Sequence, residues 1–422
     1  MTSDKDDRAY LVSKDRYAEF GVDTEKALKI LDTVALSIHC WQGDDVRGFE
    51  QDPSGPANSG LHVSGGFPGK PRTIDELRRD LQAAYALIPG HHRLNLHAIY
   101  ADTNGRSIER NAIEPSHFRS WVEWAKHENL KIDFNATCFA HPLAESGFTL
   151  SHPDKTVRKF WIEHVKCSRK IAASIGRELQ SPCIHNLWIP DGCRDIPADR
   201  WKSRVLLKNA LDDIFSVEHS LSQIKDALES KLFGIGSESF VVGSHEFYLG
   251  YALTAGKMIC LDLGHFHPTE SVADKISAIL QYTHELLIHV SRGIRWDSDH
   301  VVIFDDAVRS LAEEIVGGPG LDRVHLALDY FDGTMNRIGA WVLGARAVLK
   351  AVLSALLLPR DRILEAEQAG DNFLRLALRE ESKSLPFAAV WDRHCRKHGV
   401  PPGDRWIPDI AAYEKRILAD RA

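Results

Sequence analysis

Short apolar runs alternate along this chain with longer stretches in which apolar residues recur at helical spacing. Eight of the short runs predict strands, at 34–40, 93–100, 131–138, 183–189, 231–236, 258–264, 286–292 and 323–329. Helical patterns between them cover 74–87, 115–129, 154–178, 270–285 and 304–316. Strands that are joined through helices pair in parallel. The pattern therefore predicts an α/β fold, a (β/α)8 or TIM barrel.

Two stretches fall outside a minimal barrel. Residues 48–70 are rich in Gly, Pro and Ser and predict a long loop after the first strand. Residues 360–422 form a largely helical tail that is interrupted by prolines. We therefore expect a catalytic barrel domain over 1–358, including an N-terminal helix and the long loop, and a helical extension over 359–422. A helical tail of this kind commonly contacts a neighbouring subunit, so we expect an oligomer.

Acidic and imidazole side chains cluster at the ends of apolar runs in the second half of the chain. They are Glu229, Asp262, His265, His289, Asp297, Asp299 and Asp329, together with the cation Lys231. A parallel barrel brings its strand ends to one face. Hard divalent cations prefer carboxylate oxygens with one or two imidazoles. The pattern therefore predicts a metal site at the barrel mouth.

These side chains suffice for two ions. One ion takes Glu229, Asp262, His289 and Asp329, and the other takes His265, Asp297 and Asp299. A ligand set with carboxylates, one imidazole per ion and no thiolate suits Mn²⁺, Mg²⁺ or Co²⁺ better than structural Zn²⁺. Each piece also has a plainer interpretation: a strand histidine can be a core residue, Asp-x-Asp a turn, and Glu-x-Lys a surface ion pair.

Lys231 stands beside this acidic cluster. A cation next to bound metal ions is electrostatically unfavourable, so we expect the residue to have a functional role there. It can polarise a substrate carbonyl or donate to a developing alkoxide. The structural alternative is an ion pair with Glu229.

Composition and charge argue against several classes of protein. The chain has 422 residues, a net charge of −7 and a mean hydropathy of −0.25. The acidic charge argues against nucleic acid as a partner, since phosphate binding needs a concentrated basic face. No apolar stretch is long enough for a membrane span, and the polar N-terminus is unlike a signal peptide. The seven cysteines form no Cys-x-x-Cys pair. We expect a cytoplasmic protein with no membrane or nucleic-acid partner.

Several blocks resemble L-rhamnose isomerases over essentially the whole chain. They are SIHCWQGDDVRGFE (37–50), RLNLHAIY (93–100), NLWIPDG (186–192), ESKLFGIG (229–236), LDLGHFHPTE (261–270), RWDSDHVV (295–302), LDYFD (328–332) and NRI (336–338). A more distant similarity of arrangement is to xylose isomerase. The sequence departs from that relative in two places, because His289 replaces a carboxylate and no Asp follows His97 at the expected spacing.

The resemblance implies a TIM barrel with extra helices, assembled as a homotetramer. It implies an isomerase of L-rhamnose catabolism that interconverts L-rhamnose and L-rhamnulose with two divalent ions per subunit. Mn²⁺ is typical, and Co²⁺, Mg²⁺ and Zn²⁺ are alternatives. The ligand sets implied are the two given above, with His265, Asp297 and Asp299 on the catalytic ion.

The resemblance also implies roles for individual residues. His97 acts as the acid/base that opens the sugar ring, Lys231 contacts the reacting oxygen, and a water near Asp299 carries the proton between oxygens. The sugar pocket is expected to use Trp188, Val46, Leu61, Ile99 and Tyr100. The plainer interpretations are a strand cap for His97 and a core position for Trp188.

The expected reaction is a metal-assisted 1,2-hydride shift after ring opening, and an enediol route stays open. The nearest alternative is the same chemistry on another aldose, such as L-lyxose, L-mannose or D-allose. A metal-dependent hydrolase and a non-catalytic sugar-binding protein are the more distant alternatives.

Overall fold

The protein is described here by a computed structural model, which covers residues 2–50, 65–231, 238–294 and 296–421. Eight parallel strands close into a barrel, in which each strand pairs with the next and the last pairs with the first. In barrel order they are β1 (Ala35–His39), β2 (His91–His97), β3 (Lys131–Asn135), β4 (Cys183–Leu187), β6 (Ile224–Glu229), β8 (Met258–Asp262), β9 (Leu286–Val290) and β12 (Val324–Leu328). The closed parallel barrel confirms the predicted TIM-barrel fold.

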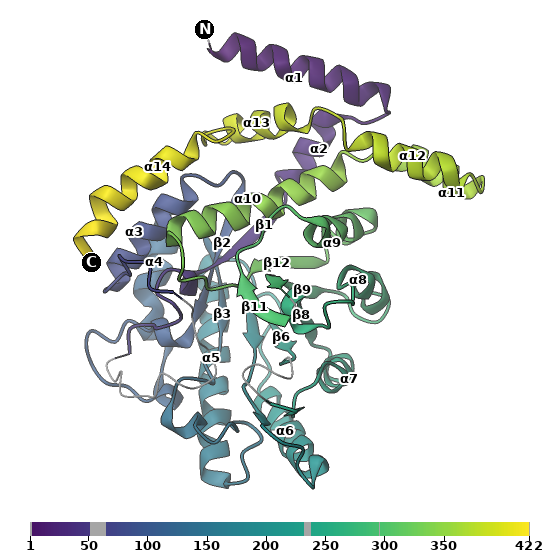
Figure 1. The fold of residues 1–422 in the computed structure, drawn as a ribbon. Coiled ribbons are helices and arrows are strands. Elements are labelled where there is room, and N and C mark those ends of the chain that lie inside the picture. Colours follow the sequence, from purple (N-terminus) through teal and green to yellow (C-terminus); the bar gives the residue numbers. More distant parts are fainter. Residues whose placement is uncertain (1, 51–64, 232–237, 295, 422) are drawn as a thin grey trace.

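Helices connect the strands and surround the barrel (Figure 1). They are α2 (Thr24–Leu31), α3 (Ile74–Tyr85), α4 (Arg119–His127), α5 (Lys155–Leu179), α6 (Arg200–Phe215), α7 (His245–Ala255), α8 (Ala273–Ile279), α9 (Asp306–Gly317) and α10 (Arg337–Leu356). Side-chain caps start several of them: Asp154 accepts from Thr156 N and Val157 N at α5, and Thr73 accepts from Glu76 N at α3. Each predicted helical stretch overlaps one of these helices.

The predicted fifth strand, 231–236, is wrong. The barrel uses Ile224–Glu229 instead, and residues 232–237 lie outside the described part of the chain. Strand β6 carries charged residues that weaken its apolar pattern, but the fold pairs them. Asp226 is buried and accepts two hydrogen bonds of 3.0 Å from Arg169 on α5. A buried charge of this kind is tolerated because it is paired and hydrogen-bonded.

Two small antiparallel pairs lie outside the barrel, β5 (Gly192–Cys193) with β7 (Phe240–Val241), and β10 (Arg292–Ile294) with β11 (Trp296–His300). Strand β11 carries Asp297 and Asp299, so these residues lie in a hairpin that follows β9 rather than at the end of an apolar run. The hairpin packs against the 3-10 turn Leu263–His265 (η6), which follows β8.

The chain ends form a layer outside α10. Helix α1 (Thr2–Glu19) packs on α13 (Phe387–Lys397), and both α13 and α14 (Trp406–Tyr413) contact α10. Figure 1 shows this arrangement, with the C-terminal helices in yellow arching over α10 and with α11 (Arg360–Gln368) and α12 (Asn372–Ser382) projecting to one side. The C-terminal helical extension is thus present as predicted. The long loop predicted at 48–70 is largely undescribed, because 51–64 lie outside the described residues.

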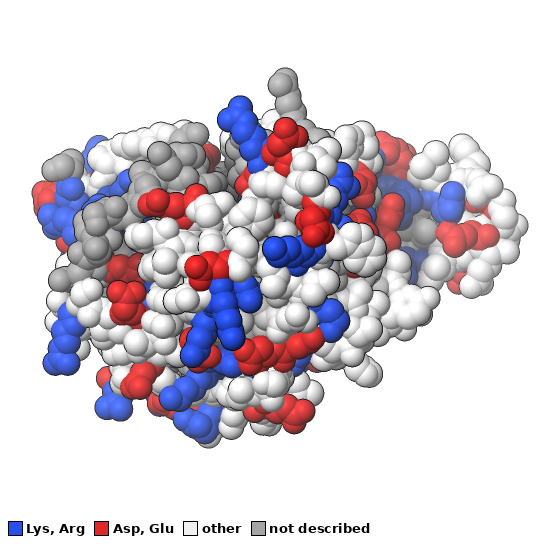
Figure 2. Space-filling view, turned by 90° about the horizontal axis from the view of Figure 1, so that it is seen from below, with Lys and Arg blue, Asp and Glu red and all other residues white. Residues whose placement is uncertain are grey.

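Among the described helices, α10 alone is long and apolar enough to cross a membrane by length and composition. In its most apolar window, 78% of the residues are buried inside the molecule. It therefore has the character of a core helix packed between the barrel and the outer layer. On the face drawn in Figure 2, basic and acidic side chains are interspersed, unlike the concentrated basic surface that binds nucleic-acid phosphates.

Candidate metal centre

A cavity opens at the carboxyl end of the barrel strands. Its lining residues come from the strand ends and from the loops that follow them. They are Trp41, Val46, His97, Asn135, Ala136, Phe139, Asn186, Trp188, Glu229, His265, His289, Asp329 and Phe331. The carboxyl end is the face on which barrel enzymes build their active sites.

Three of the acidic residues share one arrangement, in which a protein donor holds one carboxylate oxygen and the other faces His289. Glu229 ends β6 and is buried. Its Oε2 accepts a hydrogen bond of 2.5 Å from Asn186 Nδ2, and its Oε1 lies 3.3 Å from His289 Nδ1. The amide of Asn186 therefore orients the carboxylate.

Asp262 and Asp329 repeat this arrangement. Asp262 Oδ1 accepts from Gly264 N at 2.6 Å and from Ser291 Oγ at 2.9 Å, while Oδ2 lies 3.9 Å from His289 Nδ1. Asp329 Oδ1 accepts from Trp41 Nε1 at 3.0 Å, while Oδ2 lies 2.9 Å from the same nitrogen. Such outer hydrogen bonds fix the orientation of metal-ligating carboxylates.

His289 stands at the centre of these groups and is buried. Burial lowers the pKa of an imidazole, but the neighbouring Cys260, Glu229 and Asp329 raise the pKa of His289 well above its ordinary value. The same attraction, chiefly from His289, outweighs burial and lowers the pKa of Asp329 to about 2. The pocket therefore favours positive charge at its centre.

The donor set fits a divalent cation. One oxygen from each of Glu229, Asp262 and Asp329 and one nitrogen of His289 lie within 4.8 Å of one another. Three carboxylates brought this close repel one another unless a cation lies between them. Cys260 also lies within ligand range of Glu229 and His289. Burial raises the pKa of its thiol, which disfavours the thiolate form that binds metals.

His265 ends the turn η6, and its Nδ1 lies 3.5 Å from Glu229 Oε1. The structure therefore brings His265 to the same cavity as the four residues above. Asp297 and Asp299 are placed only by their backbone, on the hairpin that packs against η6. Their side chains lie outside the described part of the structure, and the second ligand set stays a prediction.

His97 is the last residue of β2, and its side chain lies on the wall of the cavity. Its Nδ1 lies 3.2 Å from the hydroxyl of Thr137, the partner that the sequence did not reveal. The rings of Trp41 and Phe139 meet it edge to face at 4.7 and 5.5 Å. Burial lowers the pKa of His97 to about 3, so the ring is neutral at neutral pH.

Lys231 follows β6 and is buried, but it is not among the residues that line the cavity. Its Nζ donates to Pro190 O at 2.7 Å and to the carboxylate of Glu238. The ion-pair partner in the structure is therefore Glu238 rather than Glu229. The expected contact between Lys231 and a reacting oxygen stays a prediction.

The residues expected in the sugar pocket divide into two groups. Trp188 and Val46 line the cavity. Ile99 and Tyr100 are buried in the 3-10 turn after β2 and do not line it. The Tyr100 hydroxyl donates to Asp44 Oδ1 at 2.6 Å, which fixes the loop that carries Val46. Leu61 lies outside the described residues.

Several residues at the cavity were not identified from the sequence, notably Asn186, Trp41 and Thr137. Asn186 and Trp41 occur in the blocks that carried the resemblance, but they are neutral, and neither has the residue type of a metal ligand. Their contribution depends on contacts between different strands and loops. Asn186 on β4 reaches Glu229 on β6, and Trp41 after β1 reaches Asp329 after β12.

Sequence comparison finds related enzymes over nearly the whole chain. The family model for L-rhamnose isomerase (RhaA) matches residues 5–421. An L-rhamnose isomerase of Rhodopirellula baltica is 51% identical over 416 residues, which cover 99% of this chain and 97% of that protein. One of Pectobacterium carotovorum subsp. carotovorum is 54% identical over 413 residues, 98% of each chain.

Among solved structures, a D-psicose 3-epimerase from Clostridium cellulolyticum H10 aligns with a TM-score of 0.45 at 11% identity, over 77% of this chain and 98% of that one. The family model and the two relatives match nearly the whole sequence. Both relatives are more than half identical to this chain. The chain therefore belongs to the L-rhamnose isomerase family of enzymes.

Proposed function

We propose that the protein is a metal-dependent aldose–ketose isomerase that interconverts L-rhamnose and L-rhamnulose. The observation that carries this proposal is the group of three oriented carboxylates around His289, in a cavity at the mouth of a barrel. Full-length similarity to proteins named L-rhamnose isomerase supports the choice of substrate.

The net reaction moves one hydrogen from C2 to C1 and one proton from O2 to O1, so no external oxidant or reductant is consumed. Divalent ions bound at the cavity would bind the oxygens of the opened sugar and offset the negative charge that develops on them. Glu229, Asp262, His289 and Asp329 would hold one ion, and His265, Asp297 and Asp299 the other. An oxygen-rich donor set supports Mn²⁺ as the ion, with Co²⁺, Mg²⁺ and Zn²⁺ as alternatives.

His97 is assigned to ring opening. A neutral imidazole on the cavity wall can accept the proton of the anomeric hydroxyl and return a proton to the ring oxygen. Its hydrogen-bond contact with Thr137 and the edge contacts of Trp41 and Phe139 fix the plane of the ring. Fixed orientation lets the ring meet the sugar hydroxyl without reorganisation.

Asp299 and Lys231 are assigned to the transfer step, Asp299 to the proton that passes from O2 to O1 and Lys231 to the reacting oxygen. For Lys231, the support is its position two residues after Glu229 and its burial. To reach the sugar, its ammonium would have to exchange the contacts with Pro190 and Glu238 for a substrate oxygen.

Apolar side chains in the lining of the cavity support a substrate with a methyl group. Trp188, Phe139, Phe331 and Val46 contribute these side chains. Val46 has φ of 59°, a costly left-handed conformation for a β-branched residue. The neighbouring Asp45, itself at φ of 60°, is held by an ion pair of 2.9 Å with Arg337. We propose that this turn presents Val46 to the methyl group, and that Leu61, Ile99 and Tyr100 support it.

The substrate assignment is tested by measuring ketose formation from L-rhamnose, L-mannose, D-allose and L-lyxose, a pentose that lacks the terminal methyl carbon. The highest kcat/KM is expected on L-rhamnose. Val46→Ala is expected to lower the preference for L-rhamnose over L-lyxose about 10-fold, because methyl contacts are lost. A higher kcat/KM on another aldose would keep the chemistry but reassign the substrate. The absence of ketose from all four sugars would contradict the proposal.

We further propose that 359–422 is a helical extension used for assembly, in a homotetramer of the barrel domain 1–358. The support is a set of exposed apolar side chains on the projecting helices: Phe373 and Leu376 are 82% and 67% exposed. Phe373→Glu with Leu376→Glu is expected to lower the mass measured by light scattering. An unchanged tetramer, or a monomeric wild type, would contradict this. The seven free cysteines support a reducing, cytoplasmic setting.

A further inference from the structure

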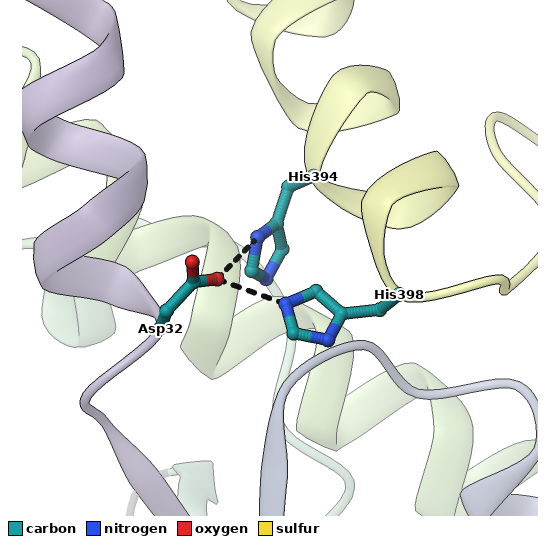
Figure 3. A group of neighbouring side chains, drawn as sticks. All are labelled: Asp32, His394 and His398. Carbon is teal, nitrogen blue, oxygen red and sulfur yellow. Dashed lines mark hydrogen bonds and ion pairs between the residues drawn. The ribbon is translucent and has the colours of Figure 1, made fainter.

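A second group of metal-ligand side chains lies far from the cavity, where the C-terminal extension meets the barrel. Asp32 is the C-terminal cap of α2, just before β1, and His394 and His398 lie on and at the end of α13. The two histidines are four residues apart and therefore face the same side of their helix. Figure 3 shows both rings turned toward the Asp32 carboxylate.

The distances fit a bound ion. His394 Nδ1 lies 3.5 Å from Asp32 Oδ1, and His398 Nε2 lies 2.8 Å from the same oxygen. For ligand atoms about 2.1 Å from an ion, the separations are about 3.4 Å in tetrahedral and about 3.0 Å in octahedral coordination. The three ligand atoms need only small adjustments to surround one cation.

The state of His394 points independently to a ligand. Its side chain is wholly buried, yet apart from the 3.5 Å contact of Nδ1 with Asp32, neither ring nitrogen has a hydrogen-bond partner among the described residues. Buried imidazole nitrogens are ordinarily satisfied, so such a group requires a partner. Burial also lowers the pKa of His394 to about 4, which leaves the ring neutral and its lone pair available at neutral pH.

The surroundings leave Asp32 Oδ1 turned toward the two rings. Lys397 pairs with the other oxygen, Oδ2, and so orients the carboxylate. The side chains of Asp32 and His398 are 22% and 20% exposed, which gives ions access from solvent. Two imidazoles and one carboxylate suit borderline transition metals such as Zn²⁺, Co²⁺ and Ni²⁺.

We propose that Asp32, His394 and His398 bind a divalent transition-metal ion that ties the C-terminal extension to the start of the barrel. The bound ion would join α13 to the segment that leads into β1, two parts of the chain more than 350 residues apart. Binding to the folded chain alone would stabilise the docked position of α13. The site is separate from the cavity and does not depend on the proposed isomerase activity.

The test is the number of Zn²⁺ ions bound per full-length chain after equilibrium dialysis, measured by elemental analysis. His394→Gln with His398→Gln is expected to lose one equivalent relative to wild type. The matched control is His127→Gln, because His127 Nδ1 lies 2.8 Å from Glu128 in an exposed pair that belongs to none of the metal-ligand groups among the described residues. Lys397→Gln removes the ion pair but no ligand. Both controls are expected to keep the full count.

Glu229→Gln with Asp329→Asn separates this site from the cavity. That variant is expected to retain the one Zn²⁺ ion per chain bound by Asp32, His394 and His398, even if the cavity binds no metal. His398→Gln alone, at the partly exposed ligand, is expected to weaken Zn²⁺ binding at this site about 10-fold or more and serves if the double variant does not fold. Equal Zn²⁺ counts in wild type and in the folded histidine variants would overturn the proposal, because Asp32 would then serve only as an ion-pair partner of Lys397 and His398.

Discussion

Asn186 Nδ2 donates a hydrogen bond of 2.5 Å to Glu229 Oε2, from the neighbouring barrel strand. This contact leaves Glu229 Oε1 directed at the centre of the cluster, 3.3 Å from His289 Nδ1. A neutral amide thereby determines which oxygen of a buried carboxylate is presented to a cation. The two other carboxylates of the cluster are oriented in the same way, by Ser291 and Trp41.

Asn186→Ala should therefore weaken metal binding without removing a ligand. We expect the metal concentration for half-maximal activity to rise about 10- to 100-fold, the range for the loss of an outer-shell partner. The control is Asn95→Ala, a buried asparagine deeper in the barrel that bonds Asn135 instead. Equal metal dependence in the two variants would show that the Asn186 contact does not tune the site.

The two proposed ligand sets should respond differently to substitution. His265→Ala is expected to lower kcat about 1000-fold or more, because several kcal/mol of charge stabilisation at the reacting oxygens are lost. Asp329→Asn is expected to lower both kcat and the thermal midpoint of the metal-loaded protein, since the ion it helps to hold stabilises the fold. Steady-state rates and thermal unfolding of the two variants are the measurements. Near-wild-type turnover in His265→Ala would refute its assignment to the reacting centre.

Thr137 is expected to act on the reaction through His97, as a positioning residue. Thr137→Val removes the hydroxyl that lies 3.2 Å from His97 Nδ1 and keeps the side-chain shape. We expect kcat to fall about 10-fold with little change in KM, because the imidazole loses its fixed orientation. Thr137→Ser should restore most of the rate. An equal loss of kcat in the Thr137→Val and Thr137→Ser variants would indicate that Thr137 has a packing role alone.

Stability should depend on pH through Glu285, at the opposite end of the barrel from the cavity. Its carboxylate lies 2.7 Å from both His325 Nε2 and Lys225 Nζ. His325 and Lys225 together outweigh burial and lower the pKa of Glu285 from 4.5 to about 2. A folded-state pKa below the unfolded value adds stability above about pH 4.5, which is lost as the pH falls toward 2.

Glu285→Gln is accordingly expected to lower the free energy of unfolding by about 2 kcal/mol at pH 7 and by roughly half of that or less at pH 3. Denaturant titrations at the two pH values provide the measurement. Glu178→Gln is the matched control, because its pair with Lys126 is exposed and should contribute about 0 to 1 kcal/mol. A difference between wild type and Glu285→Gln that is independent of pH would contradict this account.

Much of the barrel follows from local sequence, because seven of its strands are apolar runs that end near polar residues. Strand β6 was not predicted, because a charged residue such as Asp226 is typical of a solvent-exposed segment. The partners that permit its burial, Arg169 and His185, come from α5 and β4. Pairing over such distances along the chain leaves no signal in a local hydrophobic pattern.

The candidate site divides in a similar way. Glu229, Asp262, His289 and Asp329 could be grouped because strand ends meet at one face of a parallel barrel. The groups that orient these ligands could not be predicted from the sequence. A neutral asparagine or tryptophan has no distinctive pattern until its neighbour across the sheet is known. Lys231 follows the end of β6, and its contact with Glu238 is likewise one that the local sequence does not reveal.

The most direct test of the account is ketose formation from L-rhamnose by metal-stripped, full-length protein, with and without added Mn²⁺. If the three carboxylates around His289 hold the proposed ion, stripping should abolish turnover and Mn²⁺ should restore it. Circular dichroism of the stripped protein checks that the barrel stays folded. Full rhamnulose production by folded protein that elemental analysis shows to be metal-free would contradict the central claim.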